Sequence, residues 1–115
     1  MTKSKFLARQ SSDKIKKIIF VLLFLILCVP ALADTKKELG LEVFNNKAMC
    51  GTCHVLQAAG SDGNIGPDLD QLRPSIDQII YVVTNGIGVM QAWEGILSKE
   101  EIEAVAYYVF NSTNK

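Results

Sequence analysis

Five consecutive residues, Cys-Gly-Thr-Cys-His at positions 50–54, constrain this chain more than any other stretch of it. They place two thiols close together, with the only histidine of the chain, His54, directly after the second thiol. Paired thiols of this kind occur in redox dithiols, in zinc sites, in small disulfide loops and at sites of covalent haem attachment. The rest of the sequence has to distinguish between these four chemistries.

The sequence argues against three of these four chemistries. A thioredoxin-like dithiol needs a βαβ context, and the sequence shows no strand-like alternation of apolar and polar residues. A structural zinc site needs four ligands, but Cys50, Cys53 and His54 are the only thiols and imidazole beyond the N-terminal segment. A disulfide between Cys50 and Cys53 would close too small a loop to stabilise the fold much. We therefore expect one haem c, attached through thioethers to Cys50 and Cys53, with His54 as an iron ligand.

The second iron ligand can be sought by elimination. The chain has no second histidine, so the candidates are a methionine, a lysine or an open position. Met49 directly precedes Cys50 and cannot reach the opposite face of the ring. Met90 lies in a glycine-rich loop, residues 86–97, that could cover that face, and we expect it to be the second ligand. The alternative is that Met90 merely fills a gap in the core.

The N-terminal third has the composition of an export signal. Residues 1–17 carry six basic residues against one acid, residues 18–29 form an uncharged apolar run, and Pro30 is followed by Ala-Leu-Ala. This order predicts a secretory signal peptide that is cleaved after Ala33, and a periplasmic domain of residues 34–115. A retained membrane anchor is the alternative, although the apolar run is short for a span of about 20 residues.

Cys28 lies inside this apolar run. A lipoprotein signal needs a small residue just before its cysteine, and here that residue is Leu27. We therefore interpret Cys28 as an apolar residue of the signal, lost on export.

The charge of the chain depends on whether the signal is counted. The whole chain carries 12 Lys+Arg and 12 Asp+Glu, but residues 34–115 keep six of the basic and eleven of the acidic residues, a net charge of −5. An acidic domain argues against a nucleic acid or an anionic membrane as partner, because both require basic patches. We expect no stable membrane insertion once the signal is cleaved. A domain this small also needs a disulfide, a metal or a buried cofactor to supplement its core.

The mature chain is predicted to be all-α. Ser75 with Gln78 and Ser98 with Glu101 form capping boxes at the start of two helices. Apolar residues recur at helical spacing in three segments, at about 35–47, 76–85 and 99–111.

Two long segments, residues 50–74 and 86–97, separate these helices. Both are rich in glycine and show little periodicity, and the first also contains two prolines. Loops of this length in so small a domain are typical of segments wrapped around a bound group.

The sequence from about residue 35 to residue 111 resembles the small class I c-type cytochromes. The resemblance implies a cytochrome c-like orthogonal helical domain, wrapped around one covalently attached haem, that carries single electrons and is not an enzyme. The matching segments are Gly40 and Phe44, the motif at 50–54, "GPDL" at 66–69, "VTNGIGVMQAW" at 83–93 and "LSKEEIEAVAYYV" at 97–109.

The resemblance also implies roles for single residues. Gly40 and Phe44 would pack against Tyr108 where the first and last helices cross. The carbonyl of Pro67 would accept a hydrogen bond from the imidazole of His54, which fixes the ring tautomer and tunes its basicity.

The loop around Met90 contains the main departure from the family. Class I cytochromes commonly have a proline after the ligand methionine, where this chain has Gln91. A proline would stiffen the loop by fixing φ, so the sequence leaves open what holds Met90 in place. Trp93 matches a common aromatic position and is expected to pack on or near the haem edge, with a surface docking role as the alternative.

These observations predict a periplasmic one-electron carrier. Its partners would be redox proteins: a periplasmic dehydrogenase, a cytochrome complex or a terminal oxidase. One alternative is the haem-bearing electron-acceptor subunit of a periplasmic dehydrogenase that oxidises sulfite or an alcohol. Another is ligand sensing or peroxidase activity, which would require a labile bond between Met90 and the iron.

Overall fold

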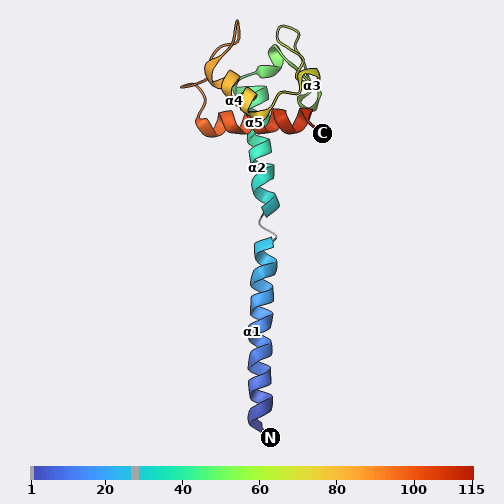
Figure 1. The fold of residues 1–115 in the computed structure, drawn as a ribbon, viewed down its shortest axis with the longest axis vertical. Coiled ribbons are helices and arrows are strands. Elements are labelled where there is room, and N and C mark those ends of the chain that lie inside the picture. The colour runs from blue at the N-terminus through green and yellow to red at the C-terminus, as the bar shows by residue number, and fades with distance from the viewer. Residues whose placement is uncertain (1, 27–28) are drawn as a thin grey trace. The chain divides into compact units, whose positions relative to one another are not determined.

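The computed structural model describes residues 2–26 and 29–115 and divides the chain into two compact units, residues 1–33 and 34–115 (Figure 1). The first unit contains α1 (Thr2–Ile26), whose large apolar side chains between residues 18 and 24 are all more than half exposed. Across the described residues, no helix is both long enough and apolar enough to span a membrane. Cys28 lies outside the described residues, and the role of residues 1–33 as a signal peptide stays a prediction.

The second unit is built mainly from helices, as expected, joined by the two long loops. Helix α2 (Val29–Glu42) leads into it from the first unit and continues as a π-helical turn, η1 (Val43–Lys47). The remaining elements are the short 3-10 turns η2 (Cys50–Thr52) and η3 (Gln57–Ala59), the strands β1 (Val55–Leu56) and β2 (Ser61–Asp62), and the helices α3 (Leu69–Leu72), α4 (Ile76–Asn85) and α5 (Lys99–Thr113).

The capping boxes predicted for the second and third helices are present. At the start of α4, the Ser75 hydroxyl accepts from the Gln78 N–H, and the Gln78 side chain accepts from the Ser75 N–H. Ser98 and Glu101 exchange the same two bonds at the start of α5. Each box satisfies two backbone N–H groups that the helix itself cannot pair, so both helices begin where the sequence predicts.

Helix α5 is a central part of the core. It packs against α4, α3, β1 and η1, and Figure 1 shows α3 beside its C-terminal end. The apolar stripe expected on α5 is buried throughout, and the core also takes side chains from α4, η1 and the long loops. Its most buried members are Val43, Phe44, Leu56, Ala104, Val105 and Ala106.

Helix α2 crosses α5 at a glycine. A Cβ on Gly40 would overlap the carbonyl oxygen of Ala104 and would lie 2.5 Å from the Cβ of Tyr108. Because Gly40 has no side chain, the two helices approach closely enough for Phe44 and Tyr108 to meet, with ring centroids 6.2 Å apart and planes tilted by 56°. The predicted packing of these three residues is confirmed.

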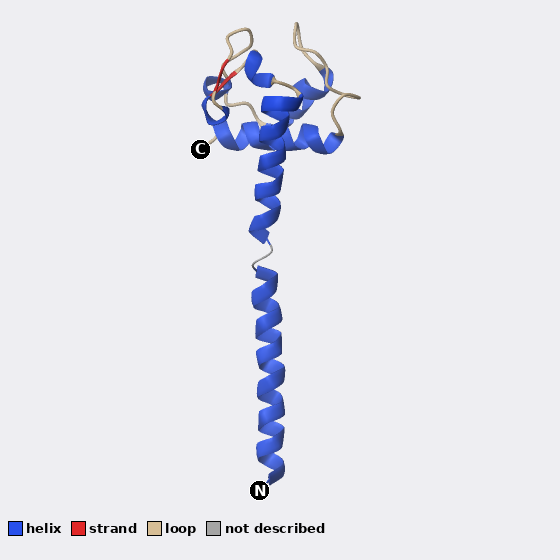
Figure 2. Cartoon of the chain, turned by 180° about the vertical axis from the view of Figure 1, so that it is seen from behind, coloured by secondary structure: helices blue, strands red, loops and turns tan. Residues whose placement is uncertain are grey.

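The second unit also contains one pair of short strands, which no pattern in the sequence indicated. Strands β1 and β2, drawn in red in Figure 2, pair antiparallel with Val55 opposite Asp62 and Leu56 opposite Ser61. The hydroxyl of Ser61 accepts from the N–H of Leu56 at 3.0 Å and donates to its carbonyl at 3.3 Å. Strands of two residues are too short to show any alternation of apolar and polar side chains.

Candidate functional site

The Cys-Gly-Thr-Cys-His segment forms a single tight turn. Residues Cys50–Thr52 are 3-10 helical, and the carbonyl of Cys50 accepts from the N–H groups of Cys53 and His54 at 3.1 and 3.0 Å. The turn begins at Met49, which has a left-handed backbone (φ 48°) and an exposed side chain. The turn therefore holds both sulfur-bearing residues and the histidine on one short, internally bonded segment.

Both cysteines of the motif are free thiols and are partly buried. Burial raises the pKa of the Cys50 thiol to about 11, because a thiolate is poorly solvated there. The thiol is therefore neutral at neutral pH, and less reactive in disulfide exchange than a thiolate would be. Two reduced, closely spaced thiols are what the formation of two thioethers requires.

The imidazole of His54 is fixed from two directions. Its Nδ1 lies 2.8 Å from the carbonyl oxygen of Pro67. A carbonyl can only accept, so Nδ1 carries the proton and the lone pair of Nε2 is free to bind a metal. Gly66 packs against the ring, because a Cβ there would lie 2.5 Å from Cε1 and 2.9 Å from Nδ1. The contact between His54 and Pro67 that the resemblance implied is thus present.

Sequence reasoning missed the way in which residues 61–67 fold over the motif. A Cβ on Gly63 would lie 2.6 Å from the carbonyl carbon of Cys53, and one on Gly51 would lie 2.6 Å from the Cβ of Ser61. The N–H of Gly66 donates to the carbonyl of Cys53 at 2.7 Å. The signal was available in the sequence as Gly51, Gly63 and Gly66, whose missing side chains leave room for one backbone to rest on another.

The second long loop carries Met90 and Trp93. Both side chains are partly buried and pack against the core. Met90 exchanges two backbone hydrogen bonds with Ile87, and the N–H of Trp93 donates to the carbonyl of Val83 in α4. Within residues 29–115, no hydrogen bond joins Met90 or Trp93 to the motif at 50–54.

The residues present fit a haem. The donor set offers two thiols, an imidazole with a free Nε2 and a thioether, which is the set that a haem c with histidine and methionine ligands uses. Four large apolar side chains on the two long loops are also more than 60% exposed, so they are available to contact an apolar group such as a porphyrin. They are Ile65, Ile87, Val89 and Ile96.

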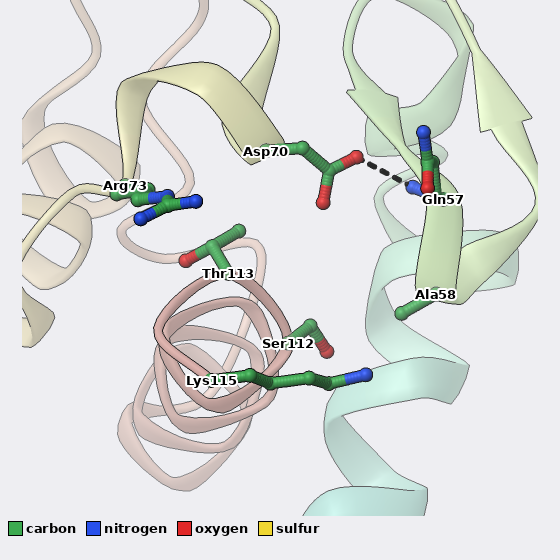
Figure 3. Close-up of a pocket in the computed structure, with 7 residues that line it drawn as sticks. All are labelled: Gln57, Ala58, Asp70, Arg73, Ser112, Thr113 and Lys115. Carbon is green, nitrogen blue, oxygen red and sulfur yellow. Dashed lines mark hydrogen bonds between the residues drawn. The ribbon is translucent and has the colours of Figure 1, made fainter.

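A separate pocket, drawn in Figure 3, has a different character. The carboxylate of Asp70 points toward Gln57 and accepts from its backbone N–H at 2.8 Å. The lining is polar and charged, without the aromatic and aliphatic surface that a porphyrin requires, and it includes none of the predicted site residues. The lining residues are Gln57, Ala58, Asp70, Arg73, Ser112, Thr113 and Lys115.

Comparison with known proteins decides between the chemistries of the motif. The family model described as "Cytochrome C oxidase, cbb3-type, subunit III" matches residues 36–109, which is most of the second unit. The chain belongs to the mono-haem c-type cytochromes. It is therefore an electron carrier with covalently attached haem c, and Cys50 and Cys53 are the attachment residues.

Individual relatives of this cytochrome agree. Cytochrome c6 of Chlorolobion braunii is 36% identical over 83 residues, covering 64% of this chain and 86% of that protein. The chloroplastic cytochrome c6 of Chlamydomonas reinhardtii is 39% identical over 82 residues, covering 63% of this chain but only 51% of that protein. The matched region therefore spans about half of the Chlamydomonas protein.

A solved structure supports the fold. The c-type cytochrome SorU from Sinorhizobium meliloti superposes with a TM-score of 0.67 at 44% identity, covering 71% of this chain and 95% of that one. The all-α cytochrome c-like fold is therefore confirmed for this cytochrome.

Proposed function

We propose that this cytochrome is a periplasmic one-electron carrier whose haem iron is bound by His54 and Met90. The observation that carries the proposal is the hydrogen bond from His54 Nδ1 to the carbonyl of Pro67, because it presents Nε2 as a metal ligand. When bound, the haem supplies an iron that alternates between Fe(II) and Fe(III). Cys50 and Cys53 would tether the haem, His54 and Met90 would bind its iron, and the surrounding chain would shield it from water.

Each site residue has a distinct task in this proposal. The thioethers of Cys50 and Cys53 would hold the haem within reach of His54. The carbonyl of Pro67 keeps the imidazole in one orientation and raises its basicity. The thioether of Met90 favours the ferrous state and so raises the reduction potential, and Trp93 covers the haem near its edge.

With both His54 and Met90 bound to it, the iron would have no open position for a substrate. The cytochrome then passes electrons to docked proteins through brief encounters with small interfaces. The net charge of −5 on residues 34–115, from six basic and eleven acidic residues, predicts basic surfaces on at least some of its redox partners.

The periplasmic location rests on the composition of residues 1–33. Expression of the full chain in a bacterium with haem-attachment machinery, followed by mass measurement of the periplasmic protein, would test it. We expect a chain that begins at Asp34. An intact chain in the membrane fraction would show instead that the N-terminal segment is retained as an anchor.

A second hypothesis is that the cytochrome is the haem-bearing subunit of a larger oxidoreductase, such as a periplasmic dehydrogenase that oxidises sulfite or an alcohol. The matching family is itself described as an oxidase subunit, which favours this possibility. Crosslinking in the periplasm and purification of the tagged cytochrome would distinguish the two. A stoichiometric catalytic chain would support the subunit hypothesis, and its absence would support the free carrier.

Replacing Met90 tests the assignment of the second ligand. We expect Met90→Ala to abolish the ferric charge-transfer band that reports a methionine–iron bond, and to lower the midpoint potential, because the ligand that favours Fe(II) is lost. Optical spectra and a redox titration of the haem-loaded protein measure both effects. Met49→Ala is the matched control, since its exposed side chain is predicted to play no part in ligation. An unchanged band in Met90→Ala would exclude Met90 as the ligand.

A further inference from the structure

The loop around Met90 folds as a small hairpin. The N–H of Ile87 donates to the carbonyl of Met90 at 3.0 Å, and the N–H of Met90 donates back to the carbonyl of Ile87 at 2.9 Å. This reciprocal pair closes a two-residue turn at Gly88 and Val89. Gly88 has a positive φ of 55°, which such a turn requires, and Val89 at the tip is 94% exposed.

Gly86 is in close contact with the backbone that follows this turn. A Cβ there would lie 2.6 Å from the carbonyl oxygen of Met90, 2.7 Å from the backbone nitrogen of Ala92 and 2.9 Å from the carbonyl carbon of Gln91. Its φ of 72° is also positive, and with ψ of 168° this backbone conformation is one that essentially only glycine adopts. The N–H of Gly86 donates to the carbonyl of Val82 at 2.8 Å, which joins this contact point to the end of α4. The backbone that follows the ligand residue thus rests on a glycine that is itself fixed to a helix.

The far side of the loop is also bonded to α4. The N–H of Trp93 donates to the carbonyl of Val83 at 2.9 Å, and the N–H of Glu94 donates to the carbonyl of Thr84 at 3.3 Å. Backbone hydrogen bonds therefore fix the chain on both sides of Met90. Ile87 makes them on the N-terminal side and Trp93 on the C-terminal side.

We propose that Gly86 is a positioning residue for Met90. Contact of the backbone at residues 90–92 with the Cα of Gly86, together with the pairing of Ile87 and Met90, holds the thioether in place. This arrangement stiffens the loop around Met90. In other class I cytochromes, a proline after the ligand methionine has this role. The inference rests on the proposed function, in which Met90 binds the iron.

The backbone at Gln91 can accept a proline, so the stiffness of the loop can be increased as well as decreased. Within the described part of the second unit, the N–H of Gln91 donates no backbone hydrogen bond, and its φ is not positive. A proline there removes no hydrogen bond and meets no conflict in the sign of φ. Gln91→Pro therefore adds the missing stiffener, and its effect shows how much rigidity the loop lacks.

The experiment measures how often the methionine leaves the iron. Imidazole is mixed with the haem-loaded ferric protein in a stopped-flow instrument, and the limiting rate at high imidazole reports the opening of the Met90–iron bond. We expect Gly86→Ala to raise this rate by about tenfold or more, because the new Cβ pushes the 90–92 backbone away. We expect Gln91→Pro to change it by less than about threefold, because the loop is already held.

Gly95→Ala is the matched control. Gly95 also has a positive φ, 80°, but a Cβ there meets nothing within 4 Å. Both alanine variants place a side chain at a residue of positive φ and should melt at lower temperature, whereas only Gly86→Ala should speed imidazole binding.

The outcomes separate this inference from the assignment of the ligand. Equal limiting rates in Gly86→Ala and Gly95→Ala would overturn the role of Gly86. A tenfold slower rate in Gln91→Pro would also overturn it, because the loop would then lack the stiffness that we assign to it. If Gly86→Ala does not accumulate, the Gln91→Pro rate decides alone. A charge-transfer band that survives in Met90→Ala would show that Met90 does not bind the iron. Gly86 could then have no role in positioning a ligand.

Discussion

His54 owes its orientation to two adjacent residues with no reactive side chain. The carbonyl of Pro67 accepts the Nδ1 proton at 2.8 Å, and the Cα of Gly66 faces the ring. The resemblance to class I cytochromes predicted the first contact, because it concerns a known motif. The second was not predicted, because the need for a glycine arises from the distance between two backbones and not from any local pattern.

Two further residues show the limit of sequence reasoning at this scale. Met49 and Arg73 both have φ of 48°, a conformation that residues other than glycine seldom adopt. Met49 precedes the haem-attachment turn and Arg73 ends α3. Neither side chain is of a type that marks left-handed positions, so the sequence gives no sign of them.

Substitution of Gly66 tests the support of the imidazole. The Cβ of Gly66→Ala would lie 2.5 Å from His54 Cε1, so the ring must move away from Pro67 or the loop must yield. We expect the Nδ1–H resonance of His54 in the ferrous protein to shift and the midpoint potential to change, because the proposed iron ligand loses its hydrogen-bond partner. Proton NMR and a redox titration measure these effects. Gly60→Ala is the control, since nothing lies within 4 Å of its Cβ. An unchanged resonance would show that Gly66 does not support the ring.

At the scale of elements, the helices were predicted far better than the loops. The capping boxes and apolar stripes place the start of α4 at Ile76 and of α5 at Lys99, because caps and periodicity are local properties of the sequence. The contents of residues 50–74 were predicted only as a wrapped loop. The β1–β2 pairing there depends on the hydroxyl of Ser61 and on contact with the motif, which are tertiary effects.

The crossing of α2 and α5 should tolerate no side chain at Gly40. A methyl group there would overlap Ala104, so we expect Gly40→Ala to lower the free energy of unfolding by about 1–3 kcal/mol, as overpacking does in other cores. Guanidinium unfolding of the haem-loaded protein measures the change. Lys37→Ala, at an exposed position of α2, is the control. Equal stability of Gly40→Ala and the wild type would mean that the helices can separate without cost.

The ion pair between Lys47 and Glu101 joins η1 to the first turn of α5. The hydrogen bond from Lys47 lowers the pKa of Glu101 below its ordinary value of 4.5, and the same bond raises the pKa of Lys47 above 10.5. The stabilisation from Glu101 is therefore present above pH 4.5 and is lost as the pH falls through its folded pKa. The stabilisation from Lys47 is present below pH 10.5 and is lost as the pH rises through its folded pKa.

Glu101→Gln should reveal this dependence on pH. We expect the variant to melt at lower temperature than the wild type at neutral pH, and the difference to shrink as the pH falls from 4.5 through the lowered pKa at which Glu101 of the folded wild type becomes protonated. Thermal melts across this range measure it. Glu103→Gln is the control, because the Lys99–Glu103 pair is exposed at 3.8 Å and exposed pairs contribute little. A difference that stays constant down to the most acid pH would contradict the pairing.

At the scale of the whole molecule, the haem is part of the fold. The second unit is small, and domains of this size commonly need a cofactor, a metal or a disulfide to supplement the core. The cofactor and the fold class were both predictable, because one short motif specifies the cofactor and the cofactor explains the loops. The hairpin that holds Met90 was not predictable, since it depends on which backbone atoms meet Gly86.

Loss of either attachment residue should therefore unfold the domain. We expect Cys50→Ala and Cys53→Ala to yield a largely unfolded apoprotein, since so small a core depends on the haem. Far-UV circular dichroism and thermal melts measure this. In the wild type, the haem should stay with the protein in acidified organic solvent, because it is covalently bound. A cooperative melt of either variant without haem would show that the polypeptide core is sufficient.

The contact between Lys47 and Glu101 joins residues 54 positions apart in sequence, and the crossing at Gly40 likewise brings the first helix of the domain onto the last. A chain that emerges from the ribosome, or threads through a translocation channel, cannot form either contact until α5 is free. The core is therefore closed by the last helix to appear, and contacts of such long range form slowly. This order of events leaves the thiols of Cys50 and Cys53 open to the attachment machinery while the rest of the chain is still arriving.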